Sequence, residues 1–190
     1  MDAIIHVFTF KAGLLARVAH DLRLTLRQHE IKVHARRVQA SAVAESLAID
    51  GVMTPSGLDT RTLSAKDQRS ILETMHNEIL LSRRYPRIEI EGSIQTQADR
   101  GNRHTFNGEL RLRGQARPIQ TELIRSGDTL QSVFELKPSE FGIAPYKALG
   151  GAIKLEDRVR VSISVALAGH SPEELLERSE PLQLQAAAVA

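Results

Sequence analysis

The sequence predicts a mainly β protein, an eight-stranded antiparallel barrel with one substantial α-helix between strands 3 and 4. Apolar and polar residues alternate with a period of two in eight segments, which is typical of strands with one buried face. One further segment has its apolar residues at helical spacing. An open sheet of eight strands would leave two edges unpaired, so we expect closure into a barrel. The length of 190 residues favours a single barrel domain, which we place at residues 1–169.

Three strands are expected before the helix. The first covers residues 4–10, and a short helical turn at residues 13–19 follows it. The second covers residues 22–33, with a bulge near residues 28–31, where the apolar residues change parity. The third covers residues 38–44.

A loop and then the helix come next. Glycine and proline residues recur within residues 50–62, which predicts a loop. Ser64 and Asp67 have the spacing of a capping box and predict the start of a helix over residues 65–81. Pro86 follows the expected end. The apolar stripe of this helix consists of Ile71, Leu72, Met75, Ile79 and Leu80.

Five strands follow the helix, at residues 88–94, 106–113, 117–125, 130–137 and 159–167. Gly114 marks a tight turn between the second and third of these strands. Gly108 lies on the apolar face between Phe106 and Leu110, where a barrel can bend or a ligand can approach. The loop over residues 138–155 is a candidate lid for the barrel mouth.

The alternating pattern stops after residue 169, and residues 170–190 are expected to be a C-terminal tail, a short helix or disordered. Ser171 as the cap and Pro172 in the first turn favour a short helix at the start of this segment. Residues 184–190 are expected to be frayed.

Charge and composition narrow the class of protein. The net charge is only +2, so no strong nucleic-acid or membrane field is implied. The chain has no cysteine, which excludes disulfides, thiolate metal sites and a cysteine nucleophile. No signal peptide and no run of roughly 18 apolar residues are recognisable. These features predict a soluble cytoplasmic protein.

Metal and nucleic-acid sites are not expected. His29 and His34 are five residues apart on a predicted strand, so an unbulged strand would point them to opposite faces. We expect both to face solvent. A basic cluster lies at Arg17, Arg23, Arg27, Lys32, Arg36 and Arg37. Acidic residues interrupt it and the chain has few aromatic residues, which argues against a nucleic-acid partner.

Small residues follow one face of the predicted third strand, at Val38, Ala40, Ala42 and Ala44. If this face points inward, the barrel is under-filled there, unless the helix packs closely on it. An elongated apolar ligand would fit such a cavity, because each buried methylene contributes about 0.8 kcal/mol. The ordering of the ligand offsets much of that gain.

Three blocks in order resemble one known family. They are residues 66–88, where the helix runs through Tyr85-Pro86 into a strand, residues 106–119, and Phe141-Gly142-Ile143 with Asp157-Arg158-Val159. Over residues 3–168 the chain resembles the YceI family of lipocalin-like, polyisoprenoid-binding proteins. The resemblance implies an extended eight-stranded barrel, a long apolar cavity for an isoprenoid or fatty-acyl chain, and a tendency to form a homodimer. Many relatives are secreted to the periplasm.

The resulting hypothesis is a barrel that binds an isoprenoid quinone, a polyisoprenoid or a fatty-acyl chain for carriage, storage or sensing, with no cofactor and no metal. His20 and Arg117 are candidates for contact with a ligand head group. The residues predicted to line the cavity are Phe8, Phe10, Leu14, Leu15, Phe106, Leu110, Phe134, Phe141, Ile143 and Tyr146.

Two alternatives remain open at this point. One is an enzyme that acts on an apolar substrate in the same cavity, with His20 as acid or base and Asp21 as its orienting group. We favour a purely structural interpretation of this pair. In it, the polar side chains connect the end of a helix to the start of a strand. The other alternative is a structural barrel that holds no ligand. The residues favour a binding protein over an enzyme.

Overall fold

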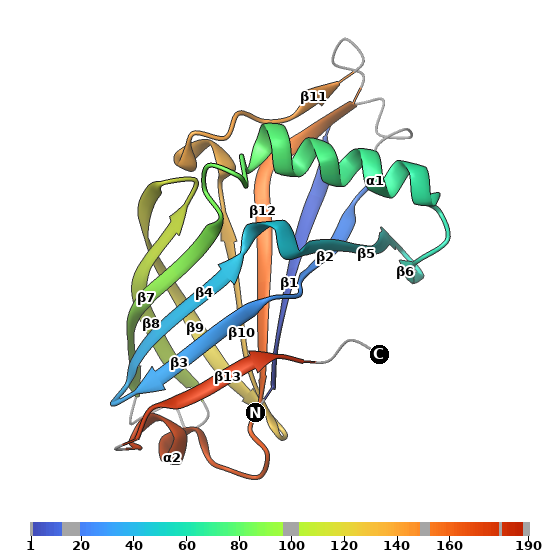
Figure 1. Ribbon diagram of the computed structural model, residues 1–190. Coiled ribbons are helices and arrows are strands. Elements are labelled where there is room, and N and C mark those ends of the chain that lie inside the picture. Colours follow the sequence, from blue (N-terminus) through green and yellow to red (C-terminus); the bar gives the residue numbers. More distant parts are fainter. Residues whose placement is uncertain (1, 13–19, 97–102, 149–152, 179, 188–190) are drawn as a thin grey trace.

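The computed structural model describes residues 2–12, 20–96, 103–148, 153–178 and 180–187 (Figure 1). The predicted helical turn at residues 13–19 lies outside this range. Helical segments are α1 (Ala65–Thr74), η2 (Met75–Ile79), α2 (Pro172–Leu176), η1 (Ala44–Ser46) and η3 (Pro138–Phe141). The strands are β1 (Asp2–Ala12), β2 (Leu22–Leu26), β3 (His29–His34), β4 (Arg37–Val43), β5 (Leu47–Thr54), β6 (Gly57–Asp59), β7 (Arg87–Thr96), β8 (Arg103–Leu112), β9 (Gln115–Ser126), β10 (Thr129–Leu136), β11 (Lys147–Ala148), β12 (Ile153–Ala166) and β13 (Leu182–Ala186).

Nine strands close into a barrel. Hydrogen-bonded neighbours follow the order β12, β10, β9, β8, β7, β4, β3, β13, β1, and β1 pairs back with β12. The pair β1–β13 is parallel, whereas its neighbours β3–β13 and β1–β12 are antiparallel. The prediction of a closed barrel is confirmed, but the predicted count of eight strands is wrong. The additional strand is β13, and the other strands of the sheet extend from the ring.

β13 also corrects the expectation of a frayed tail. Leu184 lies opposite Ile31 on β3, and Gln185 lies opposite Asp2 on β1. The two neighbouring edges would otherwise have no partner at this level of the barrel, and their free backbone groups explain why residues 182–186 are ordered as a strand. The predicted short helix with Ser171 as its cap is confirmed, because α2 begins directly after it.

The predicted second strand is in fact two strands with different partners. β2 pairs with β1 and β5, whereas β3 pairs with β4 and β13. The chain changes partners at residues 27–28. The amide of Arg27 donates to the carbonyl of Ser46 at 3.2 Å, and the amide of Val43 donates to the carbonyl of Gln28 at 2.9 Å. The parity change in the sequence marks a break between strands, where a bulge was predicted.

Most of residues 50–62 form strands, so the predicted loop is wrong there. β5 pairs with β2, and β6 turns back along β5 and extends the sheet beyond the barrel. Gly51 lies inside β5 because a Cβ at this position would come within 2.5 Å of the carbonyl oxygen of Asp59. Here glycine permits close approach of two backbones and does not end the strand.

The predicted helix exists, and its second part is π-helical. The amide of Asp67 donates to Ser64 Oγ at 3.2 Å, and the amide of Ser64 donates to Asp67 Oδ2 at 3.1 Å, which confirms the capping box. α1 continues directly into η2, where the amide of Leu80 donates to the carbonyl of Met75 at 2.8 Å. In Figure 1 the helix lies across one end of the barrel, while α2 lies at the other.

The remaining predicted strands are confirmed as β7, β8, β9, β10 and β12. Arg113 and Gly114, with φ of 51° and 73°, form the two-residue turn between β8 and β9. Two positive φ angles in succession are the geometry that matches the twist of a hairpin.

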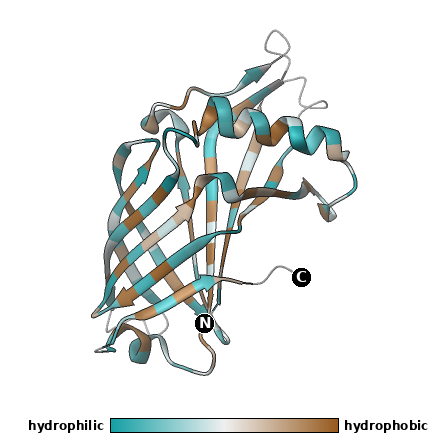
Figure 2. Ribbon diagram, in the orientation of Figure 1, coloured by the Kyte–Doolittle hydropathy of each residue, from teal (hydrophilic) through white to brown (hydrophobic). Residues whose placement is uncertain are grey.

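Buried apolar side chains form clusters toward both ends of the barrel. In Figure 2 hydrophobic and hydrophilic residues alternate along the strands. One buried cluster, which includes Leu24, Ile49 and Met75, lies beneath the helix. A second, which includes Phe106 and Leu184, lies toward α2. Within the described residues, no helix has the length and apolar character needed to cross a membrane.

Candidate functional site

The barrel encloses an apolar cavity of about 180 Å³ beneath the helix, which we call the upper cavity. Alternate residues of β1 line it, namely Ile5, Val7 and Thr9, because successive side chains of a strand point to opposite faces. The helix covers it with Met75, Ile79 and Leu80. The predicted helical stripe therefore faces the interior of the barrel.

A second apolar cavity of about 100 Å³ lies toward α2, and we call it the lower cavity. The lining of the two cavities changes in order along β12. Val159 and Val161 line the upper cavity, Ile163 lines both, and Val165 and Leu167 line the lower one. Four residues line both cavities and define a shared junction: Ala40, Ile90, Phe134 and Ile163. The two cavities therefore lie end to end along the barrel.

Small side chains on β4 explain part of this unfilled space. Ala40 and Ala42 line the upper cavity, as the sequence led us to expect of an inward face. Ala44 is buried in η1, after the end of β4. The prediction of an under-filled wall is thus correct for two of the three alanines.

Two buried polar atoms in the upper cavity lack a hydrogen-bond partner within the described part of the chain. They are Thr9 Oγ1 and His29 Nε2. The other ring nitrogen of His29, Nδ1, lies 2.8 Å from the carbonyl oxygen of Leu26. A buried polar group without a partner costs about 1–3 kcal/mol. A ligand with a hydrogen-bonding group would relieve that cost.

His29 was expected to face solvent, and the structure corrects this. The break between β2 and β3 turns its side chain to the interior, where it lines the upper cavity. The change in the parity of apolar residues near residues 28–31 was the signal available in the sequence. It does not show which side chains on either side of the break point to the interior. In the lower cavity, by contrast, Thr121 Oγ1 and Ser132 Oγ lie 3.0 Å apart and can satisfy each other.

Charged side chains gather at the rim of the upper cavity. Arg158 Nε donates to Glu156 at 2.9 Å, and both residues belong to the cavity lining together with Tyr146. The guanidinium of Arg158 lies 4.1 Å from the centroid of the Phe10 ring. The hydrogen bond to Glu156 raises the pKa of Arg158 above its usual value. The rim is therefore polar and carries a paired positive and negative charge beside an apolar interior.

The structure places some of the predicted ligand-binding residues in the cavities and others outside them. Leu110, Phe134, Ile143 and Tyr146 line the upper cavity, and Phe106 and Phe134 line the lower one. Phe141 is buried in the cluster that contains Leu110 and Ile143. Leu14 and Leu15 lie outside the described residues.

The remaining candidates, Phe8, Phe10, His20 and Arg117, line neither cavity. Phe8 belongs to the outward face of β1, and its ring centroid lies 6.2 Å from that of His6. The register of β1 against β12 shifts between Thr9 and Lys11, so Phe10 lies at the rim beneath Arg158. Phe8 and Phe10 therefore lie outside both cavities.

The two polar candidates have other neighbours. Hydrogen bonds from the hydroxyl and the amide of Ser64 lower the pKa of Asp67, and His20, near the start of α1, makes the smallest contribution to this lowering. The carboxylate of Asp21 accepts a hydrogen bond from the amide of Lys11 at 2.7 Å. Arg117 lies opposite Leu110 and donates to the carbonyl of Ala116 at 2.7 Å.

Gly108 makes room for an aromatic ring. It pairs with Gly92 on β7, and a Cβ on either glycine would lie within 2.6 Å of Phe106 Cζ. The ring of Phe106 thus lies over two glycines on neighbouring strands. Neither glycine lines a cavity, so Gly108 shapes the wall and does not meet the space where a ligand would lie.

The fold and these cavities define a class: a closed β-barrel with an apolar interior and a polar rim. The family model of the YceI-like domain matches residues 8–167, and the chain belongs to this family. α2 and β13 lie beyond the matched residues. None of the curated proteins matches the chain.

Three solved structures share the fold. BcnA of Burkholderia cenocepacia is 13% identical, with a TM-score of 0.57 over 85% of this chain and 94% of BcnA. A polyisoprenoid binding domain from Saccharophagus degradans is 10% identical, with a TM-score of 0.55 over 85% of this chain and 91% of that domain. The YCEI protein of Campylobacter jejuni is 12% identical, with a TM-score of 0.50 over 75% of this chain and 81% of that protein.

Proposed function

We propose that the protein binds an elongated apolar molecule inside the barrel, of the isoprenoid-quinone, polyisoprenoid or fatty-acyl type, for carriage, storage or sensing. The observation that carries this proposal is the pair of apolar cavities that meet end to end at Ala40, Ile90, Phe134 and Ile163. Membership of the YceI-like family supports it, as does the likeness to a domain described as polyisoprenoid-binding.

The energetics favour a long chain as the ligand. Each methylene that leaves water for an apolar interior contributes about 0.8 kcal/mol. The cost of ordering a flexible chain offsets part of this gain, so net affinity falls well below the sum.

The polar atoms of the upper cavity favour a ligand that also carries a hydrogen-bonding group. Thr9 Oγ1 and His29 Nε2 are buried there without partners in the described chain. The hydroxyl of an alcohol, the carbonyl of a quinone or the carboxyl of a fatty acid would pair with one of them. A pure hydrocarbon would leave both unpaired.

Native mass spectrometry of gently purified protein tests the proposal. We expect bound species of lipid mass, or uptake of geranylgeraniol and palmitic acid after incubation. Ala40→Phe places a large side chain at the junction and should reduce the bound fraction at least tenfold. Gln39→Phe is the matched control, because Gln39 is exposed on the same strand.

The proposal is overturned if purified protein carries nothing and takes up neither probe. Equal binding by Ala40→Phe and the wild type would also contradict it, provided that both fold. Far-UV circular dichroism and the unfolding midpoint of each variant establish that the barrel is intact.

A further inference from the structure

We infer that α2 and β13 form the floor of the ligand cavity and set the greatest chain length that the barrel accepts. This inference rests on the proposed binding function. It assigns a specificity-determining role to a segment that lies beyond the residues matched by the family model, which end at residue 167.

Five residues of this segment line the lower cavity: Pro172, Leu175, Leu176, Leu182 and Leu184. Leu176 and Leu184 have exposed fractions of 3% and 2%, so their side chains point into the barrel and are shielded from solvent. An apolar chain that passes the junction would meet these side chains at its end.

The two ends of the interior differ in polarity and exposure, and this difference indicates the end at which a ligand enters. The lining of the upper cavity includes the exposed residues Ala144 and Pro145 and the charged pair Glu156 and Arg158. The orphaned polar atoms of Thr9 and His29 also belong to the upper cavity. A chain with one polar end would keep that end in the upper cavity and extend its apolar end toward α2.

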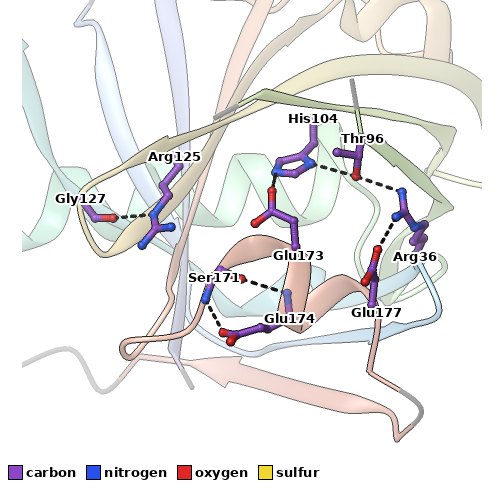
Figure 3. A network of polar contacts seen from close by, with 9 residues as sticks. All are labelled: Arg36, Thr96, His104, Arg125, Gly127, Ser171, Glu173, Glu174 and Glu177. Atoms are coloured by element: carbon purple, nitrogen blue, oxygen red, sulfur yellow. Dashed lines mark hydrogen bonds and ion pairs between the residues drawn. The ribbon is translucent and has the colours of Figure 1, made fainter. Parts of the chain in front are cut away.

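A network of polar contacts holds the floor against the barrel, and Figure 3 shows its members. Arg36 donates to Glu177 at 2.7 Å and to Thr96 at 2.9 Å, and its amide donates to the carbonyl of Leu176 at 3.0 Å. His104 Nε2 lies 3.6 Å from Glu173. These contacts join α2 to the barrel strands around it.

Backbone pairing holds the rest of the segment. β13 lies between β3 and β1 and is paired with both. Because α2 and β13 are fixed in this way, we expect them not to move aside for a ligand chain that is longer by one methylene. The barrel should therefore impose a sharp limit on chain length.

A series of saturated fatty acids of increasing length measures this limit. For the wild type we expect affinity to rise about fourfold per methylene, and then to stop rising at a defined length. Leu176→Ala removes volume from the floor and should move this plateau to longer chains. Leu182→Ala should do the same at a half-buried position, and it serves if Leu176→Ala fails to fold.

Leu136→Ala is the matched control, because Leu136 lines the upper cavity and not the floor. It should weaken binding of all chain lengths and leave the plateau where it is. If the wild type binds no chain of any length, the proposed function fails. If the wild type shows a plateau that neither floor variant moves, the function stands and the inference about the floor is overturned.

Discussion

At the scale of single residues, the pairing of Gly92 with Gly108 shows how two absent side chains shape the wall. The sequence indicated that Gly108 was special but left open whether it marked a bend or the path of a ligand. The structure places the ring of Phe106 over both glycines. Phe106 then lines the lower cavity from this position. The alternation of apolar and polar residues along β8 correctly predicted that Phe106 faces the interior. The exact position of its ring depends on the neighbouring strand, β7, which supplies Gly92.

We expect Gly108→Ala to lower the free energy of unfolding by about 1–3 kcal/mol, because the added methyl group would overlap the Phe106 ring and the backbone of β7. Urea denaturation measures the change. Glu109→Ala, on the exposed face of the same strand, is the control and should alter stability by less than about 0.5 kcal/mol. A Gly108→Ala variant as stable as the wild type would mean that the ring is not confined there.

At the scale of elements, α2 docks on a buried histidine. The side chain of His104 is fully buried, and its Nε2 has no hydrogen-bond partner within the described residues. Burial lowers the pKa of His104, Glu173 raises it, and Arg36 lowers it. The balance is a pKa below the usual value of 6.5, so the folded protein favours the neutral ring.

Stability should therefore depend on pH near neutrality. Below the ordinary histidine pKa the unfolded chain binds a proton that the folded chain resists, so stability falls as the pH decreases through this range. We expect the free energy of unfolding to decrease from pH 7.5 to pH 5.5. Burial and Arg23 also lower the pKa of His6, which contributes in the same direction.

Urea titrations of His104→Gln across this pH range measure how much of the pH dependence of the free energy of unfolding is due to His104. The variant should lose part of the pH dependence and keep the part due to His6. His170→Gln, at an exposed position, should behave as the wild type. An unchanged pH dependence in His104→Gln would contradict the assignment.

Elements whose signals are local could be predicted from the sequence. Both capping boxes, at Ser64 and Ser171, and the Arg113-Gly114 turn depend on residues within one helical turn or one hairpin. The split of residues 22–33 into β2 and β3 depends on which distant strands take each half. β13 alternates apolar and polar residues, but over only five positions, and its pairing depends on β3 and β1, which lie far away in the sequence.

At the scale of the whole molecule, the barrel depends on β13 for its closure. The predicted eight strands account for the periodic segments, and the interior of the observed barrel is apolar as expected. The cavity lining followed from parity where a strand is continuous, as at Leu110 and Phe134. It failed on β1, because alternation alone does not say which of the two faces points inward: Ile5, Val7 and Thr9 line the upper cavity, whereas Phe8 and Phe10 line neither cavity.

Deletion of residues 169–190 should lower the unfolding midpoint and open the ring between β1 and β3. We expect amides in the parts of β1 and β3 that pair with β13 to lose protection in hydrogen exchange. Deletion of residues 188–190 alone is the control and should preserve that protection. Retained protection in the larger deletion would show that β1 and β3 close directly on each other.

The parallel pairing of β1 with β13 also bears on how the chain is made. Asp2 and Gln185 are neighbours in the sheet, although almost the full length of the chain separates them. A growing chain on the ribosome holds its first strand unpaired on that side until residues 182–186 emerge. Contacts of such wide separation form late and slowly, and open strand edges invite aggregation meanwhile. The demand for chaperones should therefore persist until residues 182–186 have emerged and paired with β1.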